Sequence, residues 1–451
     1  MSTQTIDSRQ QTIDVTDYVD KRKLNAFNFL LVVLSFLVIM VDGYDITVAA
    51  FAVPQLVKEW GFESPGTFKW ILSASLFGML FGAPLLGYVG DRFGRKTAIL
   101  ASYVVFGLFT LAGAWSHSVL ELAVLRFLAG IGIGGLLPNV VALNAEFAPR
   151  RLQATAVIIS FAGITLGGSL PGPIAAYLMP HYGWPILFYL GGLVPLLLAG
   201  LIAAMLPESI RFLALKDRQA AAAAMVQRMD PGTVLPTGAR FVVHLGQKLP
   251  FRYLFSGKLA VMTPLLWVLF VVNLMAYFFL VSWMPTLLAS TSMPTQAAFA
   301  TMVLQIGGFV GALAIALPLD RRGMLPVVAL FVLAVPITGA IGYMVQQSPA
   351  ALMAVVALAG FCTLGTQFGL NAISAIIYPT ALRSTGSGAC FGVGRVGAIG
   401  GPFIGGTLID MKLPVQDLYM MAAIPFVIGA VASFILMPMF AERMATHGPG
   451  R

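Results

Sequence analysis

Two carboxylates lie together in the first long apolar run of the chain, in the sequence Asp42-Gly43-Tyr44-Asp45. Residues three apart share one face of a helix, so we expect both carboxylates to point the same way. An ionised carboxylate inside a bilayer is costly, and burial favours its neutral form. This environment suits a reversible proton carrier. The alternative is a carboxylate held permanently in an ion pair with Arg126.

Two arginines also interrupt apolar runs. Arg126 shares a helical stripe with Gly130 and Gly134 and lies at a depth similar to that of the two acids, which predicts pairing with them. The alternative for Arg126 is an arginine that extends to the interface. Arg395 lies about eleven residues into its run, near the midplane, where it needs an anion. That anion is either a protein acid or a substrate carboxylate, which the planar guanidinium binds through two hydrogen bonds.

Further polar and aromatic residues in the apolar runs are candidates for substrate contact. Aromatic residues in such runs more often serve packing or anchor the helix at the interface. With Arg395, the candidate set is Tyr44, Asn273, Tyr277, Trp283, Gln305, Gln367 and Asn371.

These residues belong to a chain of unusual composition. Of its 451 residues, 58% are apolar and 10% are charged, against roughly 25% charged in soluble domains. A soluble protein of this size cannot bury so much apolar surface, which excludes a soluble enzyme, a nucleic-acid binder and a disordered scaffold. Long uninterrupted apolar runs also exclude a membrane β-barrel. The fold class is therefore an all-α membrane protein.

Twelve apolar runs are long enough to cross a bilayer. They divide the chain into a tail (1–25), a six-helix bundle (26–206), a central loop (207–258), a second six-helix bundle (259–440) and a second tail (441–451). The predicted spans are 26–53, 70–89, 97–116, 120–145, 153–179, 185–206, 259–289, 297–319, 325–345, 350–377, 384–409 and 417–440.

The distribution of basic residues predicts the orientation of these spans. Of the 27 Lys and Arg residues, 22 lie in the tails and in every second loop, whereas the intervening loops hold three. The positive-inside rule therefore predicts that both termini are cytoplasmic.

The two halves of the chain resemble each other at an offset of 229–230 residues. Asp91 corresponds to Asp320, Gly130 to Gly360 and Pro149 to Pro379. Parallel six-span repeats are typical of transporters in which a site between the halves opens alternately to either side.

Neither a metal site nor an enzyme is expected. Cys362 and Cys390 both lie in apolar runs, and the four histidines are scattered without metal-ligand spacing. We expect no cofactor, and no pattern of nucleophile and base points to catalysis.

Several motifs resemble the major facilitator superfamily, and within it the aromatic acid:proton symporter family. The loop Gly87-Tyr88-Val89-Gly90-Asp91-Arg92-Phe93-Gly94-Arg95-Lys96 is similar to the superfamily's signature between spans 2 and 3. The run Asp42–Asp45, the Arg126 stripe, and the segment from Tyr378-Pro379 to Arg395 resemble the family. The resemblance implies the major facilitator fold and a requirement for Asp42 and Asp45 in transport.

The resemblance also implies a gate at the inner face. Asp91 is expected to engage the start of a helix in the other half, where the helix dipole favours a carboxylate. The alternative is a basic loop that only sets topology. The corresponding loop of the second half, around Asp320, departs from the signature, because Ala316 replaces its first glycine and Met324 and Leu325 replace its final basic pair. The candidate gating residues are Asp91, Arg92, Arg95, Glu146, Arg150, Asp320 and Arg383. Glu146 is expected either to form an ion pair with Arg95 or to lie in a solvated loop. The run Pro207-Glu208-Ser209 is expected to serve the same gate.

The resemblance further implies proton-driven import of an aromatic carboxylate such as 4-hydroxybenzoate, protocatechuate or benzoate in the bacterial inner membrane, and we expect the carrier to work as a monomer. The expected partners are the substrate, protons and the lipid bilayer, without nucleic acid. The alternatives are a symporter or exporter of another organic acid or a sugar-like solute, and a membrane sensor that does not transport.

Overall fold

Long helices account for most of the chain. The structure, a computed structural model, describes residues 12–21, 25–230, 239–243, 249–291 and 294–447. The first half contains α2 (Ala26–Glu59), α3 (Lys69–Phe93), α4 (Arg95–Gly113), α5 (Val119–Gly134), α6 (Leu136–Phe147), α7 (Arg150–Ser169), α8 (Pro171–Tyr182) and α9 (Pro185–Met205), with the short 3₁₀ helix η1 (Pro65–Phe68) before α3. The second half contains α12 (Leu259–Ala289), α13 (Pro294–Arg322), α14 (Leu325–Met344), α15 (Pro349–Ile377), α16 (Thr380–Asp410) and α17 (Val415–His447).

Each of the twelve predicted spans falls on one helix or on two consecutive helices. The predicted fourth span is divided at Gly134 and Gly135 into α5 and α6, and the fifth is divided at Pro171 into α7 and α8. Glycine and proline both weaken a continuous helix, which explains these two positions.

Eleven stretches of the described chain are long and apolar enough to cross a membrane. The predicted eleventh span corresponds to α16, which is not among them although it has 31 residues. Nine residues of α16 are glycine, which lowers its mean hydropathy while it lets neighbouring helices approach closely.

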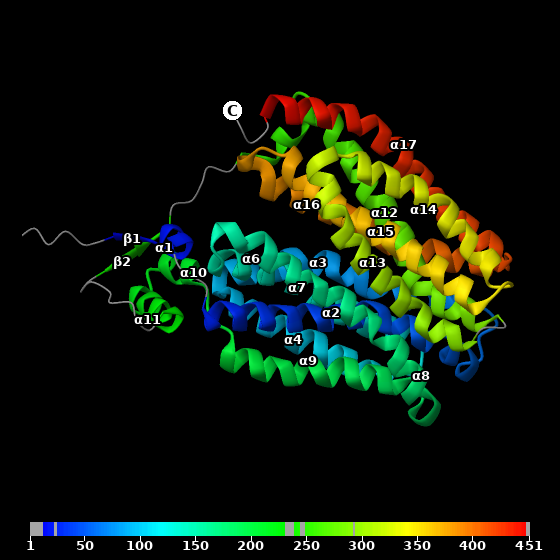
Figure 1. The fold of residues 1–451 in the computed structure, drawn as a ribbon. Coiled ribbons are helices and arrows are strands. Elements are labelled where there is room, and N and C mark those ends of the chain that lie inside the picture. The colour runs from blue at the N-terminus through cyan, green and yellow to red at the C-terminus, as the bar shows by residue number, and fades with distance from the viewer. Residues whose placement is uncertain (1–11, 22–24, 231–238, 244–248, 292–293, 448–451) are drawn as a thin grey trace, which may run out of the picture.

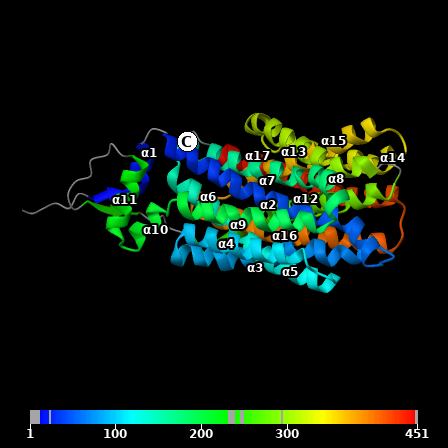
Figure 2. The same cartoon turned by 90° about the horizontal axis from the view of Figure 1, so that it is seen from below.

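The helices form two bundles that lie side by side (Figure 1). In this view α2–α9 form the lower bundle, coloured blue to green, and α12–α17 form the upper one. Figure 2 turns the molecule so that the first bundle faces the viewer. α3 and α16 are in contact across the two bundles, as are α2 and α12 and also α7 and α13.

Equivalent helix contacts confirm the internal repeat. A Cβ added to Gly130 in α5 would collide with the backbone of Ser75 in α3, and a Cβ added to Gly360 in α15 would collide with the backbone of Leu304 in α13. Ser75 and Leu304 are separated by the same offset as the sequence repeat. The two halves therefore use the same close packing between their second and fourth spans.

The central loop and the N-terminal segment fold together at one end of the first bundle. This cap comprises β1 (Thr12–Asp14), α1 (Val15–Lys21), α10 (Ile210–Leu215), α11 (Gln219–Met229) and β2 (Arg240–Val242), and the short 3₁₀ helix η2 (Phe251–Phe255) follows before α12. β1 and β2 pair in parallel, with Thr12 opposite Arg240. In Figure 1 the cap lies at the end of the molecule where α17 also ends. We call this the inner end and the opposite one the outer end.

Candidate functional site between the two bundles

Asp45 and Arg126 form a buried ion pair within the first bundle. Arg126 Nη1 lies 2.6 Å from Asp45 Oδ1, and the exposed side-chain fractions are 2% and 0%. Arg126 Nη2 also donates to the backbone carbonyl of Asp45 at 3.0 Å and to Ser75 Oγ at 3.0 Å. Thr110 Oγ1 donates to Asp45 Oδ1 at 3.2 Å. The predicted pairing is therefore present for Asp45, and it joins α2, α3, α4 and α5.

Asp42 has a different environment from Asp45, although it lies one turn away on α2. Its side chain is fully buried, and neither carboxylate oxygen has a hydrogen-bond partner among the described residues. Gly43 places this part of α2 so close to α7 that an added Cβ would collide with the backbone of Ile164. An ionised carboxylate without a donor is unfavourable in such a place.

Arg395 is the positive charge that acts on Asp42 from the second bundle. It lies on α16, and the charges of its guanidinium and of the Asp42 carboxylate interact across the interface. Arg395 is partly exposed and forms no hydrogen bond or ion pair with any residue that the structure describes. Its five N–H donors are therefore available to a carboxylate other than those of the protein.

Three of the predicted substrate contacts form a chain of amides between α12 and α15. Asn273 Nδ2 donates to Gln367 Oε1 at 2.9 Å, and Gln367 Nε2 donates to Asn371 Oδ1 at 3.0 Å. Asn273 Nδ2 also donates to the backbone carbonyl of Thr363 at 3.2 Å, while its own Oδ1 is buried without a partner in the described chain. This chain of amides therefore retains an unused acceptor.

The remaining substrate candidates are all engaged in protein contacts. Tyr277 donates its hydroxyl to Gln305 Oε1 at 2.9 Å, and Gln305 reaches across the interface to Gly168 of α7. Trp283 is fully buried and donates to the backbone carbonyl of Pro402 at 2.9 Å. Tyr44 donates to the backbone carbonyl of Leu187 at 3.0 Å and packs on α9. Tyr44 and Trp283 thus serve packing within their own bundles.

Arg95 is the centre of a charged cluster at the inner end. It forms an ion pair with Asp91 at 2.7 Å and lies 3.9 Å from Glu146, as predicted for Glu146. The carboxylate of Glu208 accepts hydrogen bonds from the backbone N–H groups of Arg95 at 2.8 Å and Lys96 at 3.3 Å, and Glu146 accepts one from Ser209. Glu208 therefore satisfies donors at the start of α4.

This inner cluster lies within the first bundle and its adjoining loop. Asp91 is 70% exposed and pairs with Arg95 of its own loop, rather than with a helix of the second bundle as expected. Arg92 is exposed and donates to Tyr88, and Arg383 is exposed in the first turn of α16. The side chains of Arg150 and Asp320, which also belong to the predicted gating set, lie outside the described residues.

The outer end contains polar contacts between the bundles that were not expected. Lys69 Nζ at the start of α3 lies 2.9 Å from Asp410 Oδ2 at the end of α16, and Ser64 Oγ donates to Asp410 Oδ1 at 2.6 Å. Ser73 Oγ donates to the backbone carbonyl of Ile399 at 3.1 Å. The two members of the ion pair are 341 residues apart in sequence, so no local pattern signals their contact.

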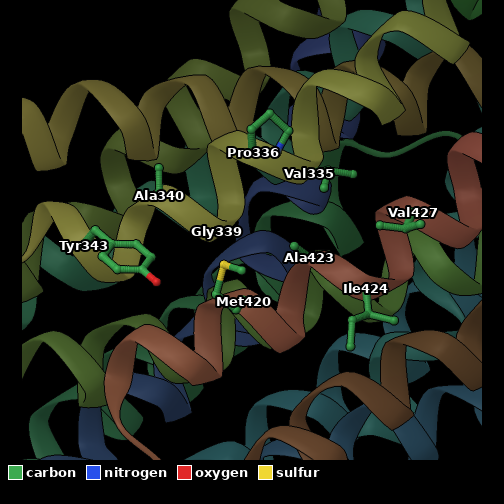
Figure 3. A pocket seen from close by; sticks show the side chains of 9 residues that line it. All are labelled: Val335, Pro336, Gly339, Ala340, Tyr343, Met420, Ala423, Ile424 and Val427. Atoms are coloured by element: carbon green, nitrogen blue, oxygen red, sulfur yellow. The ribbon is translucent and has the colours of Figure 1, made fainter.

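Two open grooves are found in the described structure, and one of them lies between the bundles at the outer end, where α2 and α8 face α12 and α13. The other groove, of about 440 Å³ between α14 and α17, is lined by apolar side chains and Tyr343 (Figure 3). Several of its residues, among them Tyr343, Met420 and Ile424, are exposed, as expected for a surface that faces lipid. In the described chain no three His, Cys, Asp or Glu residues are placed to hold a metal ion.

Comparison with known proteins adds family information to this geometry. A sequence model of the Major Facilitator Superfamily matches residues 35–402. The gallate transporter of Pseudomonas putida is 37% identical over 427 residues, which are 93% of this chain and 94% of that protein. The 4-hydroxybenzoate transporter PcaK of the same organism is 34% identical over 433 residues, covering 94% of this chain and 96% of that protein. Among solved structures, the partially occluded inward-open xylose transporter XylE of Escherichia coli superimposes with a TM-score of 0.69 at 17% identity, covering 92% of this chain and 98% of that one.

Proposed function

Because the chain belongs to the Major Facilitator Superfamily, we propose that it imports an aromatic carboxylate together with protons by alternating access. It is a multi-pass transporter of the bacterial inner membrane. The observation that carries the proposal is the guanidinium of Arg395 between the bundles, which has no hydrogen bond or ion pair among the described residues. The relatives of the chain are named as transporters of gallate and 4-hydroxybenzoate. The proposed carrier works as a monomer and performs no chemical conversion.

In this proposal Asp42 and Asp45 have separate tasks. Asp45 serves the structure of the first bundle, because Arg126 and Thr110 hold its carboxylate. Asp42 carries the proton, because its buried oxygens receive no hydrogen bond in the described structure. The neutral form of Asp42 needs less compensation than the charged form in this place.

Arg395 binds the carboxylate of the substrate, and this step couples the anion to the proton. With Asp42 ionised and the site empty, Asp42 and Arg395 together carry no net charge. With Asp42 protonated and an aromatic carboxylate on Arg395, the site is again neutral. Loading only the proton or only the anion leaves one uncompensated charge, which is costly to enclose between the bundles. The two neutral states are therefore the ones that change from outward- to inward-facing.

The amide chain of Asn273, Gln367 and Asn371 is proposed to contact the ring substituents of the substrate. The free acceptor on Asn273 suits a phenolic hydroxyl group, which donates a hydrogen bond. Such a contact rejects analogues that lack the hydroxyl, because the buried polar atom would then remain unpaired.

Uptake by purified protein in liposomes tests this proposal. Labelled 4-hydroxybenzoate is expected to accumulate when the outside is acidic, and dissipation of the pH gradient should abolish accumulation. Asp42→Asn is expected to keep exchange of internal for external substrate but to lose proton-driven accumulation, since it stays neutral. Binding without any uptake would indicate a sensor, and accumulation by Asp42→Asn equal to that of the parent protein would remove Asp42 from the coupling.

A further inference from the structure

The outer ends of the two bundles are joined by a cluster that the proposed substrate and proton sites do not use. Lys69 and Ser64 belong to the first bundle and both contact the carboxylate of Asp410 in the second. Lys69 Nζ also donates to Thr407 Oγ1 at 3.4 Å and lies 5.5 Å from the ring centroid of Phe403. We call Ser64, Lys69, Thr407 and Asp410 the outer clasp.

The backbones beneath the outer clasp approach each other closely. A Cβ added to Gly66 in η1 would collide with the backbone carbonyl of Gly406 in α16, and a Cβ added to Gly406 would collide with Lys69. Trp70 packs edge-on against Phe403, with ring centroids 4.9 Å apart. Glycine at both positions is what allows η1 and α16 to touch. The clasp is therefore a built interface with both polar and steric parts.

The position of the clasp relative to Ser73 shows what it covers. Ser73 lies one turn below Lys69 on α3, is buried, and contacts Ile399 on α16, which is four residues beyond Arg395. The clasp thus closes the seam between α3 and α16 on the outer side of Arg395. The corresponding charges at the inner end, Arg95 and Asp91, pair within one bundle.

We propose that the outer clasp is the latch that holds the carrier closed to the outside, and that Asp410 must release Lys69 and Ser64 before substrate enters. The latch is a conformational element that takes no part in substrate or proton binding. The inference rests on the proposed alternating access. Because its test uses no substrate, a negative result would refute the latch without refuting transport of an aromatic carboxylate.

The test measures access to the seam with a thiol reagent. In a background with Cys362→Ala and Cys390→Ala, the variant Ser73→Cys is reacted with a membrane-impermeant maleimide from the outside. Breaking the latch with Asp410→Asn or Lys69→Met is expected to raise the labelling rate about three- to tenfold, because a hydrogen-bonded charge pair biases a two-state equilibrium by up to about one factor of ten. The charge swap Lys69→Asp with Asp410→Lys is expected to restore slow labelling.

Two further variants keep this test decisive. Asp417→Asn removes another exposed carboxylate at the outer end, on α17, and is expected to leave the labelling rate unchanged. Gly66→Ala removes no charge, but its Cβ would collide with both the Asp410 carboxylate and the backbone carbonyl of Gly406, and it is expected to raise the labelling rate as Asp410→Asn does. Equal labelling of the parent protein, Asp410→Asn and Gly66→Ala, with all three monodisperse in size-exclusion chromatography, would overturn the proposal.

Discussion

In the first bundle the buried charges Asp45 and Arg126 neutralise each other at 2.6 Å, whereas in the second bundle Arg395 has no hydrogen bond or ion pair within the described chain. The first bundle uses its ion pair to join four helices, so the charge is part of its packing. The second bundle holds a charge that packing does not require. We therefore expect substitution of Asp45 or Arg126 to act on stability, and substitution of Arg395 to act on binding.

The largest expected effect is the loss of stability on breaking the buried pair. Asp45→Asn leaves the charge of Arg126 buried without its counterion and should cost about 3–5 kcal/mol of folding free energy. Asp42→Asn, one turn away, is the matched control, since no hydrogen bond to its carboxylate is lost in the described structure. Thermal unfolding in detergent is expected to show a clear decrease for Asp45→Asn only. Equal decreases for both variants would contradict the different environments of the two acids.

The second effect concerns ligand binding by the second bundle. Arg395→Met should weaken binding of 4-hydroxybenzoate about 100-fold, as expected for the loss of a bidentate charged contact. Its melting temperature should stay close to that of the parent protein, because no intramolecular ion pair of the described chain is removed. Isothermal titration calorimetry measures the affinity, with Arg252→Met in the exposed central loop as control. Unchanged affinity would show that the carboxylate binds elsewhere.

A smaller effect is expected at the inner end of the first bundle. Glu208→Gln removes a negative charge that accepts hydrogen bonds at the start of α4. The loss should be about 0.5–1 kcal/mol, which increases local opening about two- to fivefold. Hydrogen exchange of the amides at Arg95 and Lys96 measures it, with the exposed Glu63→Gln as control. No change in these amides would mean that Glu208 does not stabilise the helix start.

The smallest effect is expected for the dependence of the outer clasp on pH. Partial burial alone would raise the pKa of Asp410, but hydrogen bonds from Ser64 and Lys69 and the charge of Lys69 outweigh it and lower this pKa below its ordinary value of 3.8. Because the pKa of Asp410 is lowered, the ion pair with Lys69 is present at any pH above the lowered pKa and is lost only as the pH falls through that lowered pKa. Between about pH 5 and 8 the clasp should stay charged.

Uptake measured across this pH range distinguishes the role of the outer clasp from that of Asp42. Asp410→Asn should change the rate of uptake but keep the shape of its pH profile, because the clasp does not titrate there. Asp42→Asn should flatten the profile. A profile that flattens with Asp410→Asn would place proton coupling at the outer end and contradict the assignment of the proton to Asp42.

The sequence was sufficient for features that depend on periodicity and depth. Apolar runs predicted the helices, the offset between the halves predicted two related six-span units, and the similar depth of Asp45 and Arg126 predicted their ion pair. Hydropathy did not show that Gly134-Gly135 and Pro171 divide two of these helices, because a break of one residue hardly changes an average over a whole span.

The sequence did not predict features that depend on the rotation of a helix about its axis or on how the two bundles pack against each other. Asp42 and Asp45 share a face on a helical wheel, yet among the described residues α4 and α5 donate hydrogen bonds to Asp45 and not to Asp42. Tyr44, between them, turns toward α9, so its expected contact with substrate has no support in the geometry. The Lys69–Asp410 pair depends on how two separately folded bundles meet, which short-range patterns do not contain.

The parallel pairing of β1 with β2 has a consequence for biogenesis. The strand Thr12–Asp14 finds its partner Arg240–Val242 only after more than two hundred further residues have been synthesised. The partner strand is nevertheless complete before α12 begins at Leu259. The N-terminal segment can therefore close over the first bundle while the ribosome is still producing the second, which marks residues 12–242 as a unit that assembles first.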